Sequence, residues 1–273
     1  KQVQEAYTKI RNTCRFLISN LGDFNSQESG VGSRELLEID KWILLRLNRL
    51  IEKITKAYDE FEFHVVYHGL YDFCVNDLSA FYLDMSKDRL YTGGKNSPER
   101  RSAQFAMNEI LNAMIKLMAP ILSFTAEDIL KYIPQGSGAR DQGLGSVFLL
   151  DIPKADPKYL DAKLEERWEK ILKLKEEVYR ELEAVRGRKE IAASTEALVE
   201  IGLKGREWVK EIESLLPMVL IVPQVKLVAG ETITVKHAAG EKCERCWLWK
   251  EDVGKVAEHK TLCGRCASVV KAI

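Results

Sequence analysis

The sequence has no net charge and no apolar run long enough to cross a bilayer. Its 41 Lys and Arg residues balance its 41 Asp and Glu residues. Bulk charge therefore gives no attraction to nucleic acid, and such a partner would have to meet a local basic patch. No stretch has the pattern of a signal peptide or the length of a membrane-spanning helix. These absences predict a protein without a membrane partner.

Cysteine is scarce and unevenly placed. Six cysteines occur among 273 residues, and four of them lie between positions 243 and 266. Cys14 and Cys74 fall in apolar helical patterns, where free thiols are usually buried. This usage indicates a reducing compartment, so we expect a cytoplasmic protein. We also expect a monomer.

Two Cys-x-x-Cys pairs form the strongest motif. Cys243 and Cys246 flank Glu-Arg, and Cys263 and Cys266 flank Gly-Arg. This spacing is typical of a four-thiolate zinc site, in which each Cys-x-x-Cys pair forms a tight turn, called a knuckle, and a short hairpin brings the two knuckles together. Two disulfides or four free thiols are the alternatives. Because four thiolates leave no position for water, the motif predicts one structural Zn²⁺ per chain, which helps so short a segment to fold.

Apolar residues recur at helical spacing over the first 134 positions. The expected helices cover residues 3–21, 36–61, 64–90, 98–119 and 125–133. Ser97 and Pro98 suit the start of the fourth helix. Thr125-Ala-Glu-Asp128 resembles a capping box for the fifth. The pattern predicts an all-α bundle over residues 1–134.

The second half of the chain has mixed periodicity. Asp156 and Pro157 are expected to cap a long, charged helix. A helix is then expected at 206–216, and short strands at 198–203, 219–222, 225–228 and 232–235. The chain is therefore expected to be mainly α, with a bundle (1–134), a Gly- and Pro-rich linker (135–156), a long helix plus small α+β unit (157–240) and a zinc-binding module (241–273).

Several segments resemble a known family. They are IRNTCRFL at 10–17, NLGDF at 20–24, DLSAFYLD at 77–84, KDRLY at 87–91 and LMAPILSFTAED at 117–128. Together they resemble the anticodon-binding helical domain of class I aminoacyl-tRNA synthetases of the isoleucine, valine, leucine and methionine group. CERCW at 243–247 with CGRC at 263–266 resembles the C-terminal zinc finger of bacterial-type isoleucyl-tRNA synthetases. The resemblance covers essentially the whole chain.

The resemblance implies the C-terminal part of a larger enzyme that attaches isoleucine to its tRNA with ATP and Mg²⁺. The start of the chain fits this, because Lys1 to Tyr7 already have the pattern of a helix interior. The family's His-Ile-Gly-His-type and Lys-Met-Ser-Lys-Ser-type signatures and its editing domain are absent, so we expect no catalytic residue here. The implied partners are the anticodon stem-loop of isoleucine tRNA and the missing catalytic domain of the same polypeptide.

Candidate tRNA contacts on the bundle come from two segments. They are Arg11, Asn12, Arg15, Lys87, Arg89 and Tyr91. The first three could contact the tRNA or the missing catalytic domain, or form a solvated polar face. The other three lie near a helix end, where cations also suit the helix dipole. The family motif there favours contact with phosphates of the anticodon stem.

The expected zinc module offers further candidates. They are Arg245, Trp247, Trp249 and Lys250. Exposed aromatic rings beside cations suit stacking on an unpaired base of the anticodon loop. Alternatively, one ring packs the module against the α+β unit. We expect Trp247 to pack and Trp249 to be the more exposed ring.

Two other functions compete with tRNA recognition. A DNA-repair glycosylase carries a zinc finger of similar ligand spacing and would bind DNA. That family needs an N-terminal Pro followed by an acid, whereas this chain offers Lys1 and Gln2. The third possibility is a non-catalytic scaffold whose bundle and zinc module serve protein contacts only.

Overall fold

The structure is a computed structural model that describes residues 2–25, 36–134, 143 and 145–272. The chain divides into two compact units, residues 1–91 with 95–165 and residues 92–94 with 166–273. The polar loop expected up to Ser33 and the first part of the expected linker fall largely outside the described residues. No described helix is long and apolar enough to cross a membrane.

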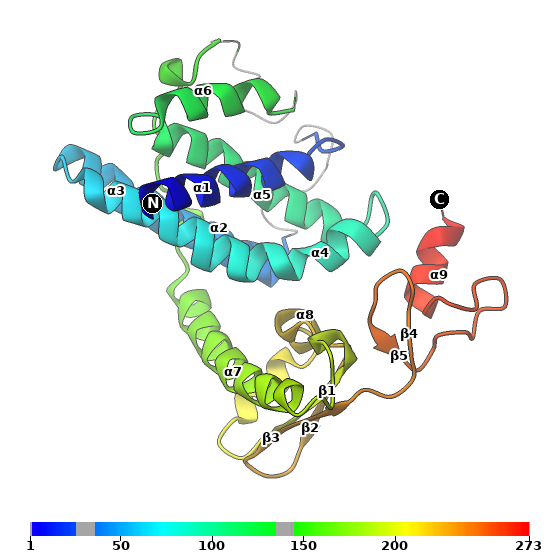
Figure 1. The fold of residues 1–273 in the computed structure, drawn as a ribbon. Helices are drawn as coiled ribbons and strands as arrows, with labels where there is room; N and C mark the ends of the chain where they lie inside the picture. Colours follow the sequence, from blue (N-terminus) through cyan, green and yellow to red (C-terminus); the bar gives the residue numbers. More distant parts are fainter. Residues whose placement is uncertain (1, 26–35, 135–142, 144, 273) are drawn as a thin grey trace. The chain divides into compact units, whose positions relative to one another are not determined.

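The first unit is a helical bundle, as predicted (Figure 1). Its helices are α1 (Gln2–Ser19), α2 (Glu38–Asp59), α3 (Phe63–Asp72), the π-helix η1 (Phe73–Tyr82), α4 (Leu83–Thr92), α5 (Pro98–Met118) and α6 (Ser123–Tyr132). The predicted helix over 64–90 is one continuous helical run, but its middle is π-helical. The helical spacing of the apolar residues did not predict that change of hydrogen-bond pattern.

The core of this unit lies between α2, α5 and the run from α3 to α4. Ile43, Leu44, Leu70, Leu78 and Tyr82 are among its largest fully buried side chains. Burial of each apolar side chain of this size stabilises the fold by about 1.5–3 kcal/mol. The apolar stripes that were read from the sequence therefore face one shared core.

Of the N-terminal caps predicted for α5 and α6, the structure contains the first but not the second. The Ser97 hydroxyl accepts a hydrogen bond from the Arg100 amide at 3.3 Å, with Pro98 at the first helical position, so this cap is confirmed. The predicted capping box of α6 is wrong, because the helix already begins at Ser123 and its N-cap Leu122 offers no side-chain bond. The Glu127 carboxylate instead accepts the amide of Val147 at 2.9 Å.

That bond ties part of the expected linker to the bundle. The short 3-10 helix η3 (Val147–Leu149) contacts α5 and α6, and Val147 is buried. Farther along, the Asn48 side-chain oxygen accepts the Asp156 amide at 2.7 Å. The described part of the expected linker thus belongs to the first unit. The division of the chain into four parts remains a prediction.

The predicted cap of the long helix is wrong by one short turn. Asp156 caps the 3-10 helix η4 (Pro157–Tyr159), where its carboxylate accepts the Lys158 amide at 3.0 Å. The long helix α7 (Ala162–Gly187) begins later. Asp161 accepts the amides of Lys163 and Leu164 at 2.9 and 3.2 Å. A second Asp in the same segment therefore takes the capping role.

The second unit combines most of α7 with a small sheet in the order β2-β1-β3 (Figure 1). Its strands are β1 (Ala197–Gly202), β2 (Gln224–Val228) and β3 (Ile233–His237). The 3-10 helix η6 (Glu207–Ile212) and α8 (Leu216–Leu220) lie between β1 and β2. β1 is parallel to β2 and antiparallel to β3. The predicted strand at 219–222 is wrong. Pro217 starts α8 there, and Ile221 ends it with a φ of 53°.

The last part of the unit, residues 241–272, is called the four-cysteine module below. It contains the hairpin β4 (Glu241–Lys242) with β5 (Trp249–Lys250), and α9 (Gly264–Lys271). Gly240 precedes the hairpin with a φ of 94°, and a Cβ there would lie 2.2 Å from the Lys250 carbonyl oxygen. Only glycine fits this close approach.

Candidate metal centre and nucleic-acid interface

The four predicted ligands come together. One sulfur from each of Cys243, Cys246, Cys263 and Cys266 lies within 4.8 Å of the others. The sulfurs of Cys246 and Cys263 are 3.9 Å apart. Four thiolates placed tetrahedrally at about 2.3 Å from Zn²⁺ would be separated by roughly 3.8 Å. The donor set and its spacing therefore fit a closed four-coordinate metal centre.

Backbone hydrogen bonds shape the turn around the first cysteine pair, and a further amide bonds one of its sulfurs. The Cys243 amide donates to the Leu248 carbonyl at 3.0 Å, and the Trp247 amide donates to the Cys243 carbonyl at 2.8 Å. The Cys263 amide points at the Cys243 sulfur, 3.3 Å away. These bonds fix the ligand directions, as outer-shell contacts do in metal sites generally.

The electrostatics of the centre also suit a cation. Burial raises the pKa of the Cys243 thiol, but backbone amides of residues 246, 263 and 245 outweigh it and lower that pKa to about 6. Burial raises the pKa values of Cys246 and Cys263. A bound cation would favour the thiolate form of all the ligands. All the cysteines are free thiols, so the disulfide alternative is not what the structure contains.

The expected roles of the two tryptophans are wrong, because the structure reverses them. Trp247 is 65% exposed and has a φ of 63°, in the left-handed region. It directly follows Cys246, at the point where the chain reverses its direction. Trp249 lies in β5 and is half-buried, with its ring edge-on to His237 at a centroid distance of 4.5 Å. The more exposed ring is therefore that of Trp247.

The two candidate cations of this module, Arg245 and Lys250, are partly enclosed. Lys250 is half-buried, and its ammonium donates to the Pro223 carbonyl at 3.1 Å. Arg245 is also half-buried, inside the first knuckle. Lys250 thus has a structural contact in addition to any contact with a ligand.

The candidates on α1 are all exposed. Arg11, Asn12 and Arg15 lie within two turns of one another on the outer surface of the helix. Neither guanidinium has an acidic partner within 4.0 Å among the residues that the structure describes. The arrangement leaves these groups available to an external ligand, and it equally suits a solvated helix face.

The three candidates on α4 do not share one environment. Lys87 is exposed and pairs with Asp84 at 2.7 Å, and Tyr91 is 57% exposed. Arg89 is only 7% exposed, because it points into the bundle towards Asp40. Burial alone would lower the pKa of Arg89, but the charge and hydrogen bonds of Asp40 raise it overall. Arg89 is therefore not positioned to meet a phosphate.

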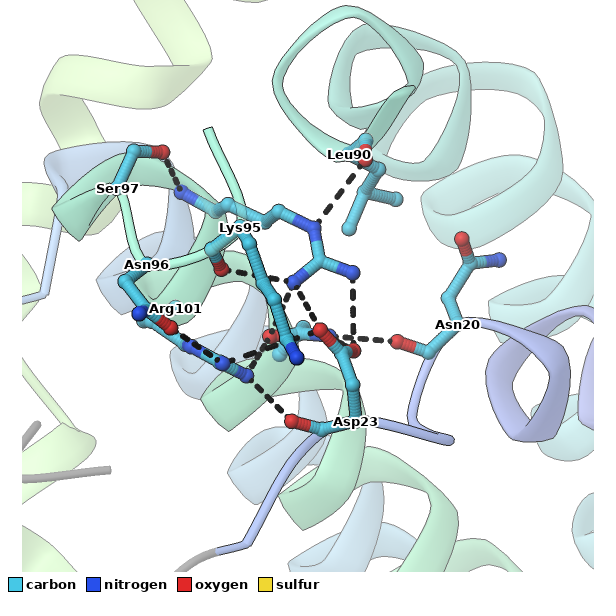
Figure 2. Close-up of polar contacts among 9 residues, drawn as sticks. Asn20, Asp23, Leu90, Lys95, Asn96, Ser97 and Arg101 are labelled. Carbon is cyan, nitrogen blue, oxygen red and sulfur yellow. Dashed lines mark hydrogen bonds and ion pairs between the residues drawn. The ribbon is translucent and has the colours of Figure 1, made fainter. Parts of the chain in front are cut away.

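Sequence reasoning missed a polar cluster beside α5, called the Asp23 cluster here. Its members are Asp23, Lys95, Asn96, Arg100, Arg101 and Gln104. Figure 2 shows Asn20, Asp23, Asn96 and Arg101 converging near the start of the helix. Two arginines in the first turn of a helix oppose its dipole, so they need an anionic partner. The presence of two arginines at the start of a predicted helix was therefore the sequence feature that could have indicated this cluster.

Comparisons with known proteins agree with this architecture. The family described as the anticodon-binding domain of tRNA ligase matches residues 40–201, more than half of the chain. The family described as the zinc finger found in FPG and IleRS matches residues 240–269, which contain the four cysteines.

Curated relatives match almost the whole chain. Isoleucine--tRNA ligases of Desulforamulus reducens, Moorella thermoacetica and Caldicellulosiruptor saccharolyticus are 44%, 43% and 46% identical over 99% of this chain. The chain spans about 30% of the length of these relatives. The structure contains the helical bundle, and the anticodon-binding family matches most of it. The chain therefore belongs to the family of anticodon-binding domains of tRNA ligases.

Proposed function

We propose that this chain is the tRNA-binding, C-terminal part of an isoleucine–tRNA ligase and that it holds the anticodon stem-loop of isoleucine tRNA. The observation that carries the proposal is the match to isoleucine--tRNA ligases over 99% of the chain, bundle and four-cysteine module together. The catalytic domain of the same polypeptide is the implied protein partner. ATP and Mg²⁺ belong to that domain, and the chain acts in the cytoplasm within a monomeric enzyme.

We further propose one structural Zn²⁺ per chain, held by the four thiolates of the four-cysteine module. Three of the ligands are buried, and Val253 and Leu262 pack against them. No fifth position is required, so the ion would stabilise the module and would not act on a substrate.

The RNA contacts would be few, because the chain has no net charge. The proposed phosphate contacts on the bundle are Arg11, Asn12, Arg15, Lys87 and Tyr91, all of which are exposed. Trp247 is the proposed stacking ring, and Arg245, Trp249 and Lys250 are the other candidates on its module. We leave Arg89 out because it is buried against Asp40. Base selectivity would come from hydrogen bonds to base edges, because stacking tolerates any base.

The two competing functions receive less support. The zinc-finger family that matches the four-cysteine module is also found in FPG. The match to the anticodon-binding domain, however, covers most of the bundle, and a DNA-glycosylase function does not explain that bundle. A scaffold would not need a bundle of the anticodon-binding type. Neither alternative accounts for the whole chain.

A binding comparison tests the proposal directly. The zinc-loaded chain is titrated with isoleucine tRNA, a non-cognate tRNA and duplex DNA of similar length at one salt concentration. Tighter binding to isoleucine tRNA than to both competitors is expected. A preference for duplex DNA would support the glycosylase-type reading, and no nucleic-acid binding at all would support the scaffold. An isoleucine stem-loop with an altered anticodon provides a matched control for anticodon reading.

A further inference from the structure

The loop between α4 and α5 is held rigidly by its own neighbours. Arg100 donates from Nε to the Leu90 carbonyl at 3.3 Å and from a terminal nitrogen to the Lys95 carbonyl at 3.0 Å. Arg101 donates to the Asn96 side-chain oxygen at 2.9 Å. Leu90, at the end of α4, and Lys95 and Asn96, in the second half of the loop, are thus bonded to two adjacent guanidinium groups.

Asp23 anchors those two guanidinium groups from another part of the chain. Its carboxylate forms a two-point ion pair with Arg100 at 2.6 and 2.9 Å. Its backbone carbonyl accepts from Arg101 at 2.7 Å, as Figure 2 shows for the labelled Asp23 and Arg101. Gln104 adds bonds to the Asn20 carbonyl and to the Asp23 carboxylate at 2.9 and 2.7 Å. The segment after α1 is therefore joined to the first turns of α5.

The arginines of the cluster are not themselves free to bind a ligand. The side chains of Arg100 and Arg101 are only 16% and 14% exposed, and their donors are used on backbone and side-chain oxygens. Lys95 differs, because it is exposed and has no acidic partner within 4.0 Å among the residues that the structure describes. Asn96 is exposed beside it. Residues 95–101 contain three cations, Lys95, Arg100 and Arg101, and one carboxylate, that of Glu99, so with Asp23 included the cations are in excess by one.

The loop directly follows two exposed residues of α4 in the sequence. Lys87 and Tyr91 are one helical turn apart and both exposed, and the chain reaches Lys95 four residues later. Residues 87–95 therefore form a stretch of chain with two exposed lysines and one exposed phenol ring. Such a stretch suits contact with a phosphodiester backbone, whose phosphates are negatively charged.

We infer that Lys95 is a phosphate-contacting residue for RNA and that Asp23 is a positioning residue that holds the Lys95 loop through Arg100 and Arg101. The inference rests on the proposed tRNA binding and extends it to a loop outside the family motif at 87–91. A loop that is ordered before binding loses less conformational entropy when the RNA arrives. The positioning bonds would thus strengthen binding without touching the RNA.

The first test is Lys95→Ala, with binding of isoleucine tRNA measured at several salt concentrations. Affinity should fall by a similar factor for cognate and non-cognate tRNA, and the slope of log affinity against log salt should fall by about one unit. Lys56→Ala is the matched control, because Lys56 is an exposed lysine of the same unit that pairs with Glu60 at 3.8 Å. Equal slopes for both variants would overturn the Lys95 assignment.

The second test is Asp23→Asn. An electrostatic effect of Asp23 and a positioning role of Asp23 predict opposite changes in RNA affinity for this variant. Loss of a negative charge beside the loop should tighten RNA binding if only electrostatics matters. A positioning role predicts weaker binding, because the amide cannot repeat the two-point pair with Arg100. Tighter or unchanged binding with native helical content would overturn the positioning role.

Asn96→Ala provides a version of that test without a charge change. It removes the Arg101 contact at the loop while the ion pair of Asp23 remains, and weaker RNA binding is again expected. If the parent chain binds no tRNA, the proposed function fails. If the parent binds but Lys95→Ala, Asp23→Asn and Asn96→Ala all behave like it, only the present inference fails.

Discussion

Asp40 and Arg89 form an ion pair that is closed off from solvent inside the bundle. The two terminal nitrogens of Arg89 lie 2.7 and 2.6 Å from the two carboxylate oxygens of Asp40. The Tyr82 hydroxyl donates to the same carboxylate at 2.6 Å. Burial first, and then the charge of Asp40, raise the pKa of Tyr82 well above its ordinary value, so this donor keeps its proton. The pair joins the first turn of α2 to the last turn of α4.

Removal of one partner of this pair should destabilise the bundle strongly. In Arg89→Met the Asp40 carboxylate stays buried without its counter-charge, and a loss of about 3–5 kcal/mol is expected. Urea denaturation followed by helical circular dichroism measures it. The double change Asp40→Leu with Arg89→Met should recover much of the loss, because no buried charge is left unpaired. A single variant as stable as the parent would contradict the buried ion pair.

The Asp23–Arg100 pair should make stability depend on acid pH. Hydrogen bonds from Arg100 first, against some burial, lower the pKa of Asp23 from 3.8 to about 2. A group whose pKa is lower in the folded state contributes stability fully above its unfolded value and loses it as the pH falls through the folded value. Parent and Asp23→Asn should therefore differ in denaturation midpoint above pH 4. The difference should shrink as the pH falls towards 2, and a constant difference would argue against this pair.

Metal analysis of the purified chain should find one zinc ion per molecule. Cys243→Ser should lose it, whereas Cys74→Ser, which changes a thiol far along the sequence, should retain it. Chelation should unfold the four-cysteine module and leave most of the helical signal, since the bundle has its own core. Full zinc content in the Cys243 variant would rule out the proposed ligand set.

Substitution of Trp247 should weaken RNA binding without lowering the stability of the four-cysteine module. A non-glycine residue at a φ of 63° carries backbone strain. Trp247→Gly should therefore leave the module as stable as the parent or slightly more stable. The same change should weaken RNA binding by roughly 1–3 kcal/mol with the salt slope unchanged, as loss of a stacking ring does. Trp249→Ala is the comparison. It should lower the module's stability, because Trp249 packs on His237.

The chain by itself should neither activate isoleucine nor charge tRNA. The sequence contains no phosphate-cradling signature of the synthetase catalytic domain. Isoleucine-dependent exchange of pyrophosphate into ATP is the direct assay, with a full-length isoleucine–tRNA ligase as the positive control. Exchange by the purified chain above the rate without isoleucine would refute the expectation.

Much of the fold could be read from the sequence because each helix has one apolar face. The stripes of α1, α2 and α5 were correct for that reason. The Ser97 cap was correct because Ser followed by Pro is a common helix start. The four ligands were also predicted, since cysteine spacing along the chain limits where the sulfurs can meet. Residues 219–222 were misread as a strand, because a short apolar run has no period that separates strand from buried helix.

The errors at the site have a different origin. Arg89 and Lys87 are two positions apart on a helix and so face different directions, which motif resemblance alone cannot show. Trp247 is directed outwards by the backbone reversal that follows Cys246, and residue type carries no sign of that reversal. The Asp23 cluster depends on contacts between distant segments. Only the conflict between two arginines and the dipole of α5 hinted at it.

The π-helix η1 sets the rotational phase of everything that follows it in the same run. Successive residues of an α-helix are turned by about 100° around the axis, and a π segment accommodates additional residues per turn. Deletion of one residue within Phe73–Tyr82 would rotate α4 by about that angle relative to α3. Arg89 would then leave Asp40, and the face that carries Lys87 and Tyr91 would no longer point outwards. The length of this segment is therefore as constrained as its composition, and homologous chains with the same outer face should keep the same residue count there.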